Sequence, residues 1–356
     1  MVSSEGTCAA FYSAGRRQPA TIGAGTPAVH TGTPAAGTGA PAARIVAVGD
    51  VHGAIDRFEA ILQKAGLIDE EQQWIGGNAV LVQTGDVADR GAGMRATFDL
   101  LMALEEQARK AGGRVHVLLG NHEAMNMVGE LRDANADIFE TFGGEAAMRE
   151  AFSPRGRYGK WLREKPAVAS IDGSIFLHGG INPEFSKGSV DDINRRVRQD
   201  LRDWDAGVAW LVEQGRLEPA PKFLDAVEAA RVEIKTLLEG DKKDEPETRR
   251  TLARLLPLDA IGTSSLFSPE GPLWFRGFNA WSDTEGTPLA MRILKQLRGQ
   301  RLVTGHSVQQ TRRITERFGG RVFLIDTGML GEPYFPNGRA SALEIVNGVT
   351  RPIYLE

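Results

Sequence analysis

Short apolar runs alternate with helical patterns in the first part of the chain, and each run ends in glycine and a polar side chain. The runs Arg44–Gly49, Ala79–Thr84 and Val115–Leu119 predict buried strands. Between them, Asp56–Ala65 and Met94–Ala111 carry apolar residues at the spacing of an amphipathic helix. Strands that alternate with helices indicate an α/β protein, and ligands of such sheets bind at the carboxyl ends of the strands.

The pattern of strands resumes later in the chain, with a long interruption. Ser174–Leu177, Arg301–Thr304 and Val322–Ile325 predict three further strands. Residues 189–256 lie between them, are rich in charge and helical in pattern, and begin with the Ser-x-x-Asp spacing of a capping box. We predict a helical insertion at about 189–256, which either forms a solvated flank or covers the functional site as a lid.

Residues 1–43 differ from the rest of the chain in composition. They are rich in Ala, Gly, Thr, Pro and Ser and show almost no aliphatic periodicity, which predicts a flexible low-complexity tail. The basic start and apolar core of a secretory signal are not visible there. The compartment therefore stays open between the cytoplasm and the periplasm of a bacterium.

Charge and cysteine usage exclude several classes of function. The 356 residues include 42 Lys and Arg against 46 Asp and Glu, a net charge of −4, so nothing predicts a nucleic-acid partner. No run approaches the roughly 20 apolar residues that a membrane span requires. The single cysteine, Cys8, excludes an intramolecular disulfide. A cysteine-dependent phosphatase also needs an arginine six residues after its thiol, where this chain has Ala14.

The polar residues that follow the predicted strands offer imidazole, carboxylate and amide donors. They are Asp50, His52, Asp86, Asn121, His122, His178 and His306. This donor set suits a divalent first-row metal ion rather than calcium. There are enough ligands for two ions, and a carboxylate that bridged them would hold the pair roughly 3.5–4 Å apart. Two such ions would lower the pKa of a bridging water and supply hydroxide near neutral pH.

Five motifs in a fixed order resemble the metallophosphoesterase superfamily: GDVHG, GDVADRG, GNHE, HGG and GH. DRG and GNHE together resemble its phosphoprotein phosphatase branch. RYGKWL, FLHGGI, GPLWFRG and IDTG are most similar to the bacterial Shewanella-like protein phosphatases. The resemblance covers about residues 44–330. It implies a catalytic domain over 44–356 with an αββα sandwich, in which two face-to-face β-sheets are flanked by helices.

The resemblance also implies a role for each motif residue. One metal ion would be bound by Asp50, His52 and Asp86, and Asp86 would bridge to a second ion bound by Asn121, His178 and His306. His122 would be the general acid, oriented by Asp89, and the phosphate would be held by Arg90, Arg276 and Asn121. Asp326 in IDTG either supports a metal ligand or belongs to a structural turn.

These roles imply a metal-dependent phosphomonoesterase that acts on phosphorylated protein side chains, Tyr and/or Ser/Thr, by attack of a metal-bridging hydroxide. We expect two divalent ions, with manganese first and iron or zinc as alternatives. The alternative function is that of a small-molecule phosphohydrolase of the same superfamily, a diadenosine-polyphosphate hydrolase or a phosphodiesterase. A binding protein without activity is disfavoured because every expected ligand is present. The sequence does not indicate the oligomeric state.

Overall fold

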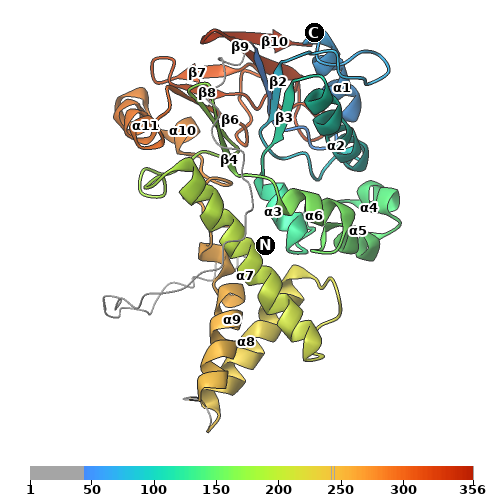
Figure 1. Cartoon of the computed structure of the whole chain (residues 1–356), viewed down its shortest axis with the longest axis vertical. Coiled ribbons are helices and arrows are strands. Elements are labelled where there is room, and N and C mark those ends of the chain that lie inside the picture. The colour runs from blue at the N-terminus through green and yellow to red at the C-terminus, as the bar shows by residue number, and fades with distance from the viewer. Residues whose placement is uncertain (1–43, 242, 244, 356) are drawn as a thin grey trace, which may run out of the picture. The chain divides into compact units, whose positions relative to one another are not determined.

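The computed structural model describes residues 44–241, 243 and 245–355 (Figure 1). The predicted tail, residues 1–43, lies outside the described residues. Two mixed five-stranded sheets form the centre of the fold. The first has the order β10-β9-β1-β2-β3, made of β1 (Ile45–Val48), β2 (Val80–Gln83), β3 (Arg114–Val117), β9 (Ser341–Val346) and β10 (Val349–Tyr354). The second has the order β4-β5-β6-β8-β7, made of β4 (Val168–Ile171), β5 (Ser174–Leu177), β6 (Arg301–Thr304), β7 (Thr315–Arg317) and β8 (Val322–Leu324).

The predicted two-sheet sandwich is confirmed. The strands β1, β2 and β3 pair in parallel, as do β5, β6 and β8, and the remaining strands join the sheets antiparallel. An apolar layer between the sheets takes side chains from both, among them Ala47, Val82, Phe176, Val303 and Phe323. This shared layer fixes the two sets of parallel strands relative to each other, so that their carboxyl ends meet.

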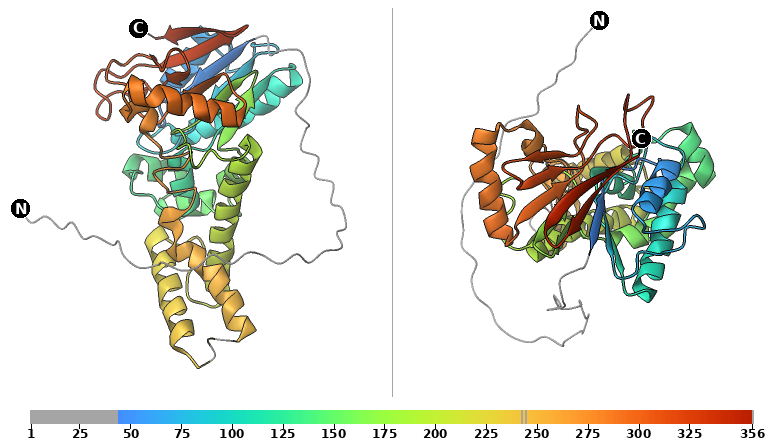
Figure 2. Two further views of the ribbon diagram at one scale, coloured as in Figure 1. Left: turned by 90° about the vertical axis from the view of Figure 1, so that its left-hand side faces the viewer. Right: turned by 90° about the horizontal axis from the view of Figure 1, so that it is seen from above.

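Helices cover the outer faces and fill the connections (Figure 2). The helices on the first sheet are α1 (Ile55–Lys64) and α2 (Met94–Lys110), and those beside the second are α10 (Gly277–Ala280) and α11 (Asp283–Leu297). The connection from β3 to β4 holds α3 (Asn121–Met127), α4 (Ala136–Phe142), α5 (Glu145–Phe152) and α6 (Arg157–Arg163). No helix in the described ranges is long and apolar enough to cross a membrane.

The strands and helices with a strong local pattern begin and end within two residues of their predicted bounds. Elements with a weaker pattern were not predicted. The hairpin of β9 and β10 turns at Asn347-Gly348, where both residues have positive φ (50° and 79°), as a type I′ turn requires. The helix α3 was also not predicted. All seven of its residues are buried, because it lies under the ends of the strands and not on a solvated face.

The predicted insertion contains α7 (Val190–Glu213), α8 (Phe223–Glu239) and α9 (Pro246–Asp259), which we call the helical arm. A short 3₁₀ helix, η1 (Ile261–Thr263), follows it. The capping box of Ser189 and Asp192 forms as expected. Buried Asn194 joins α7 to the second sheet: its Oδ1 accepts from the backbone N–H groups of Ala167 (2.9 Å) and Val168 (3.0 Å), and its Nδ2 donates to the Val168 carbonyl (2.8 Å).

Replacing Asn194 with alanine should lower the free energy of unfolding by about 1–3 kcal/mol, because buried backbone groups lose their partners. Urea denaturation at constant metal concentration measures this change. Gln199→Ala is the matched control, since Gln199 lies on the same helix with an exposed side chain that bonds only to its neighbours on the helix surface. Equal unfolding midpoints for the two variants would contradict the anchoring role of Asn194.

Candidate active site

A cavity of about 310 Å³ lies where the carboxyl ends of the parallel strands meet. The predicted site residues that line it are Asp50, His52, Asp86, Arg90, Asn121, His122, Arg276 and His306. His178 and Asp89 are fully buried behind this lining and contact it through hydrogen bonds. The structure therefore brings together all ten residues that the sequence motifs selected, from segments up to 256 positions apart.

The backbone at the site turns sharply as soon as each strand ends. His52, Asp86, Asp89, Arg90 and His306 all have positive φ, between 47° and 69°. Side chains other than glycine rarely adopt this conformation, and such residues cluster at functional sites where the surrounding structure enforces them. A glycine is needed beside His52: a Cβ on Gly53 would lie 2.2 Å from the carbonyl oxygen of Gly91.

One buried carboxylate, that of Glu123, holds this strained loop. It accepts from the backbone N–H groups of Asp86, Val87 and Ala88 (2.8, 2.8 and 3.0 Å) and of Gly120 (2.8 Å). Four donors on one carboxylate fix the position of Asp86 relative to the start of α3. Glu123 belongs to the GNHE motif but was not among the predicted site residues.

The donor atoms of the second predicted metal site converge on one point. His178 Nε2 lies 3.2 Å from Asp86 Oδ2, 2.9 Å from Asn121 Oδ1 and 3.1 Å from His306 Nδ1. Ligands at about 2.1 Å from one ion are separated by roughly 3–3.5 Å in tetrahedral geometry, so these spacings fit a first-row cation.

The first predicted site is looser and shares Asp86 with the second. His52 Nε2 lies 3.7 Å from Asp86 Oδ2 and 4.0 Å from Asp50 Oδ2. Both carboxylate oxygens of Asp50 accept from the backbone N–H of His306 (2.9 and 3.1 Å), which ties the two sheets together at this point. Asp86 Oδ2 is the atom common to both groups.

The hydrogen bonds that the three predicted imidazole ligands make to backbone carbonyls turn the other ring nitrogen of each toward the cluster. Nδ1 of His52 donates to the Ala88 carbonyl (2.8 Å) and Nδ1 of His178 to that of Thr84 (3.0 Å). His306 is reversed: its Nε2 donates to the carbonyl of Trp274 (3.2 Å), leaving Nδ1 toward the cluster. A metal-binding histidine usually donates its other N–H in this way, so the residues present fit two cations.

The charges in the cavity favour cations as well. Burial raises the pKa of Asp50, and the neighbouring carboxylates of Asp326 and Asp86 raise it further. Burial opposes ionisation of Asp86 too, but the imidazoles of His178 and His122 outweigh it and lower its pKa. Burial, reinforced by His178, lowers the pKa of His306 to about 2, so this ring is a neutral ligand.

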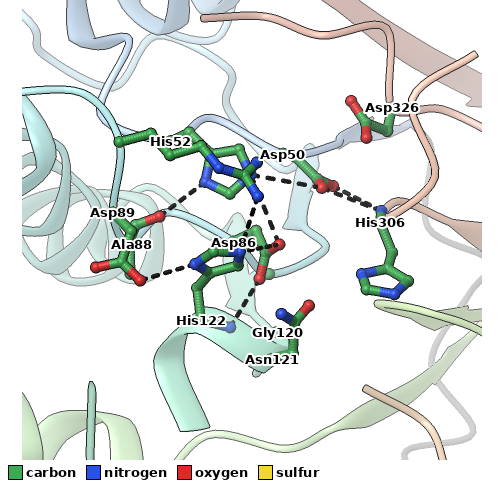
Figure 3. Close-up of polar contacts among 12 residues, drawn as sticks. Asp50, His52, Asp86, Ala88, Asp89, Gly120, Asn121, His122, His306 and Asp326 are labelled. Atoms are coloured by element: carbon green, nitrogen blue, oxygen red, sulfur yellow. Dashed lines mark hydrogen bonds and ion pairs between the residues drawn. The ribbon is translucent and has the colours of Figure 1, made fainter. Parts of the chain in front are cut away.

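His122 has the opposite character, that of a proton donor. Its Nδ1 bonds to Asp89 Oδ2 at 2.7 Å (Figure 3). Asn126 Nδ2 donates to both oxygens of Asp89 (3.0 Å each). Burial would lower the pKa of His122, but Asp86 and Asp89 outweigh it and raise the pKa to about 9. His122 Nε2 also lies 3.8 Å from Asp86 Oδ2, so geometry alone would permit it to bind a metal with His52.

Arginine and aromatic side chains complete the cavity. Nη1 of Arg90 lies 2.7 Å from Nε2 of His52 and its Nη2 lies 3.3 Å from Nε2 of His122, with the guanidinium over the Phe335 ring at 5.2 Å. Arg276 donates to the carbonyl of His306 (2.9 Å). Five further residues line the cavity that were not predicted as site residues: Arg132, Asp133, Trp274, Val308 and Phe335. Trp274 lies in the GPLWFRG motif, two residues before Arg276, whereas the other four lie outside the motifs and only the folded chain brings them to the cavity.

The helical arm reaches the cavity through stacked rings. Trp204 of α7 stacks on Phe223 of α8 (5.4 Å), Phe223 on Phe267 (5.5 Å), and Phe267 on Trp274 (6.2 Å), which lines the cavity. Among the described residues that line the cavity, none comes from 189–256. The arm therefore stands beside the cavity and does not cover it in this structure.

Comparison with known proteins supports the same assignment. The model of the calcineurin-like phosphoesterase family matches residues 43–310. Shewanella-like protein phosphatase 1 of Plasmodium berghei is 30% identical over 302 residues, 83% of this chain and 70% of that protein. The symmetrical bis(5'-nucleosyl)-tetraphosphatase of a Janthinobacterium species is 28% identical over 179 residues, 49% of this chain and 57% of that one.

A solved structure shares the fold over most of the chain. The cold-active protein tyrosine phosphatase of a psychrophilic Shewanella species superposes with a TM-score of 0.62 at 26% identity, covering 88% of this chain and 80% of the other. Together with the family match over residues 43–310, this similarity leads to one conclusion: the chain belongs to the calcineurin-like phosphoesterase family, and its relatives there include the Shewanella-like protein phosphatases.

Proposed function

We propose that the chain is a metal-dependent protein phosphatase that hydrolyses phosphomonoesters on protein side chains at a two-cation centre. The observation that carries the proposal is the position of Asp86: its Oδ2 lies within 3.7 Å of His52 Nε2 and within 3.2 Å of His178 Nε2. One carboxylate oxygen between two imidazole clusters is the arrangement that a bridged pair of ions requires.

Two groups of residues hold the cations in this proposal. Asp50 and His52 hold the first, Asn121, His178 and His306 hold the second, and Asp86 serves both. When bound, the cations supply Lewis acidity and an activated water at neutral pH. Manganese is the first candidate, with iron or zinc as alternatives, because mixed imidazole and oxygen donors suit all three. The similarity to a Shewanella enzyme supports placing the chain with the bacterial members of its group.

The side chains around the cations perform the remaining steps. Arg90, Arg276 and Asn121 line the cavity and bind the phosphate oxygens, for which an arginine fork has matching geometry. His122 gives the proton of its Nε2 to the oxygen of the leaving group, and Asp89 holds the ring in position through Nδ1. The cluster is nearly closed to solvent, with each of its imidazoles no more than 6% exposed, so the phosphate replaces water when it binds.

Phosphotyrosine is the side chain that the cavity accommodates best. Phe335 and Trp274 line it, each half-buried, and give a phenyl ring aromatic contact on entry. The similar Shewanella enzyme is a protein tyrosine phosphatase. Turnover of phosphotyrosine, phosphoserine and phosphothreonine peptides tests this proposal. Diadenosine tetraphosphate belongs in the same assay, because preferential cleavage of it would favour the tetraphosphatase-like function instead.

We also propose that residues 44–356 form one catalytic domain with the helical arm as an insertion at about 189–256. The contacts of Asn194 with the second sheet and the stacked rings that end at Trp274 support this proposal. An arm in this position would shape the approach of a peptide to the cavity from one side.

Asp86→Asn should impair binding at both sites, whereas Asp50→Asn should impair the first site alone. The reason is that Asp86 Oδ2 lies beside ligand nitrogens of both clusters, whereas Asp50 lies beside the ligand nitrogen of His52 and contacts the second cluster only at the backbone N–H of His306. Elemental analysis of dialysed protein, with titration of Mn²⁺ into metal-stripped protein, measures the number of ions bound per chain. Loss of a single ion in Asp86→Asn, or full activity with one ion, would contradict the shared carboxylate.

His122→Asn should lower kcat for alkyl phosphates by about 10²–10⁴-fold, the usual contribution of a general acid, with metal content unchanged. p-Nitrophenyl phosphate should lose less, since its leaving group needs little protonation. The two substrates are compared under identical metal loading. Equal losses on both, or loss of metal in the variant, would show that His122 is a metal ligand and not the acid.

A further inference from the structure

Asp326 is a buried carboxylate in the active-site cavity to which neither the motifs nor the proposed mechanism gives a definite role. It follows β8, is 1% exposed, and lies beside Asp50 (Figure 3). Its Oδ1 accepts from the backbone N–H of Gly328 at 2.9 Å. Its Oδ2 is buried and has no hydrogen-bond partner in the part of the chain that the structure describes.

A structural turn explains only one of the two carboxylate oxygens of Asp326. The bond from Gly328 N–H to Oδ1 is an ordinary Asx turn, which asparagine would form equally well. The second oxygen gains nothing from the turn, and leaving a buried carboxylate oxygen without a partner is costly. A negative charge at this position therefore needs another explanation.

The neighbours of Asp326 make the cost greater. Asp50 and Asp86 are also buried in this cavity, and like charges that are crowded into a buried site repel one another. Among the described residues, no lysine, arginine or histidine forms an ion pair with Asp326 within 4.0 Å. Two facing carboxyl groups such as Asp326 and Asp50 need either a shared proton or a cation between them and their surroundings.

We propose that Asp326 is a further carboxylate of the metal centre, which contributes its charge and its free Oδ2 to the cation held by Asp50 and His52. This proposal rests on the two-cation centre proposed above. It explains why a carboxylate is buried where an amide would satisfy the turn. It also gives the first site, which has only three predicted ligands in loose geometry, an additional oxygen donor.

The test is Asp326→Asn, which keeps the acceptor for Gly328 and replaces Oδ2 with an amide. Metal-stripped protein at pH 8 is titrated with Mn²⁺ in a calorimeter, and the melting temperature is measured with and without metal. We expect the Kd of the weaker site to rise by about 10- to 100-fold, as for other residues that support metal ligands. Without metal, the variant should melt at least about 2 °C higher, because one repelling carboxylate is gone.

Asp69→Asn is the matched control, since Asp69 Oδ1 accepts from the N–H two residues later, far from the cavity. This variant should change neither the Kd for Mn²⁺ nor the melting temperature without metal. Unchanged Mn²⁺ affinity in Asp326→Asn, or a lower melting temperature without metal, would overturn the proposal and leave Asp326 as a turn residue. A wild-type protein that binds fewer than two ions would instead overturn the proposed function itself.

Asp326→Ala separates the two roles of the side chain. It removes the turn bond as well as the free oxygen, so it should bind Mn²⁺ as weakly as the asparagine variant and melt below it without metal. Normal Mn²⁺ affinity in Asp326→Ala would also overturn the proposal, even if the variant melts early.

Discussion

The structure depends on the burial of several carboxylates and imidazoles in one cavity. Buried ionisable groups are tolerated only when their charges and lone pairs find partners. Here the backbone supplies partners for three imidazoles: His52, His178 and His306 each donate one ring N–H to a backbone carbonyl. Each of these three imidazoles thus turns its other ring nitrogen toward the cavity. The buried carboxylates of Asp50, Asp86 and Asp326 lie together at the ligand nitrogens, and two bound metal ions would neutralise their charge there.

This constraint explains why the fold has two sheets. The first sheet places Asp50, Asp86 and Asn121 after its parallel strands, and the second places His178 and His306 after two of its own. Neither sheet carries a complete ligand set for the second site. The apolar layer between the sheets therefore has a functional task as well as a stabilising one, because sliding the sheets by even one residue would separate the donors.

The sequence predicted what depends on local pattern and missed what depends on tertiary contact. Strand ends marked by glycine and a polar residue located the predicted metal ligands and His122, because parallel strands align those ends. The resemblance to a family supplied Asp89, Arg90 and Arg276. Glu123 and Asn126 were not assigned because their roles arise from hydrogen bonds to the loops around Asp86 and to Asp89. Phe335 was missed because nothing in the local sequence brings a residue after β8 over Arg90.

The short helix α3 connects the chemistry to the rest of the molecule. Its first turn carries Asn121 and His122, while Met127 at its other end lines an apolar cavity of about 270 Å³ together with Trp204 of the arm. Arg163 donates to the Met127 carbonyl and pairs with Asp205 of α7, both through Nη2. The arm thus contacts the far end of the helix that carries His122, and through its stacked rings it also contacts Trp274 at the cavity. These two points of contact join the arm to the elements that carry site residues, so the arm and the cavity are packed as one structure.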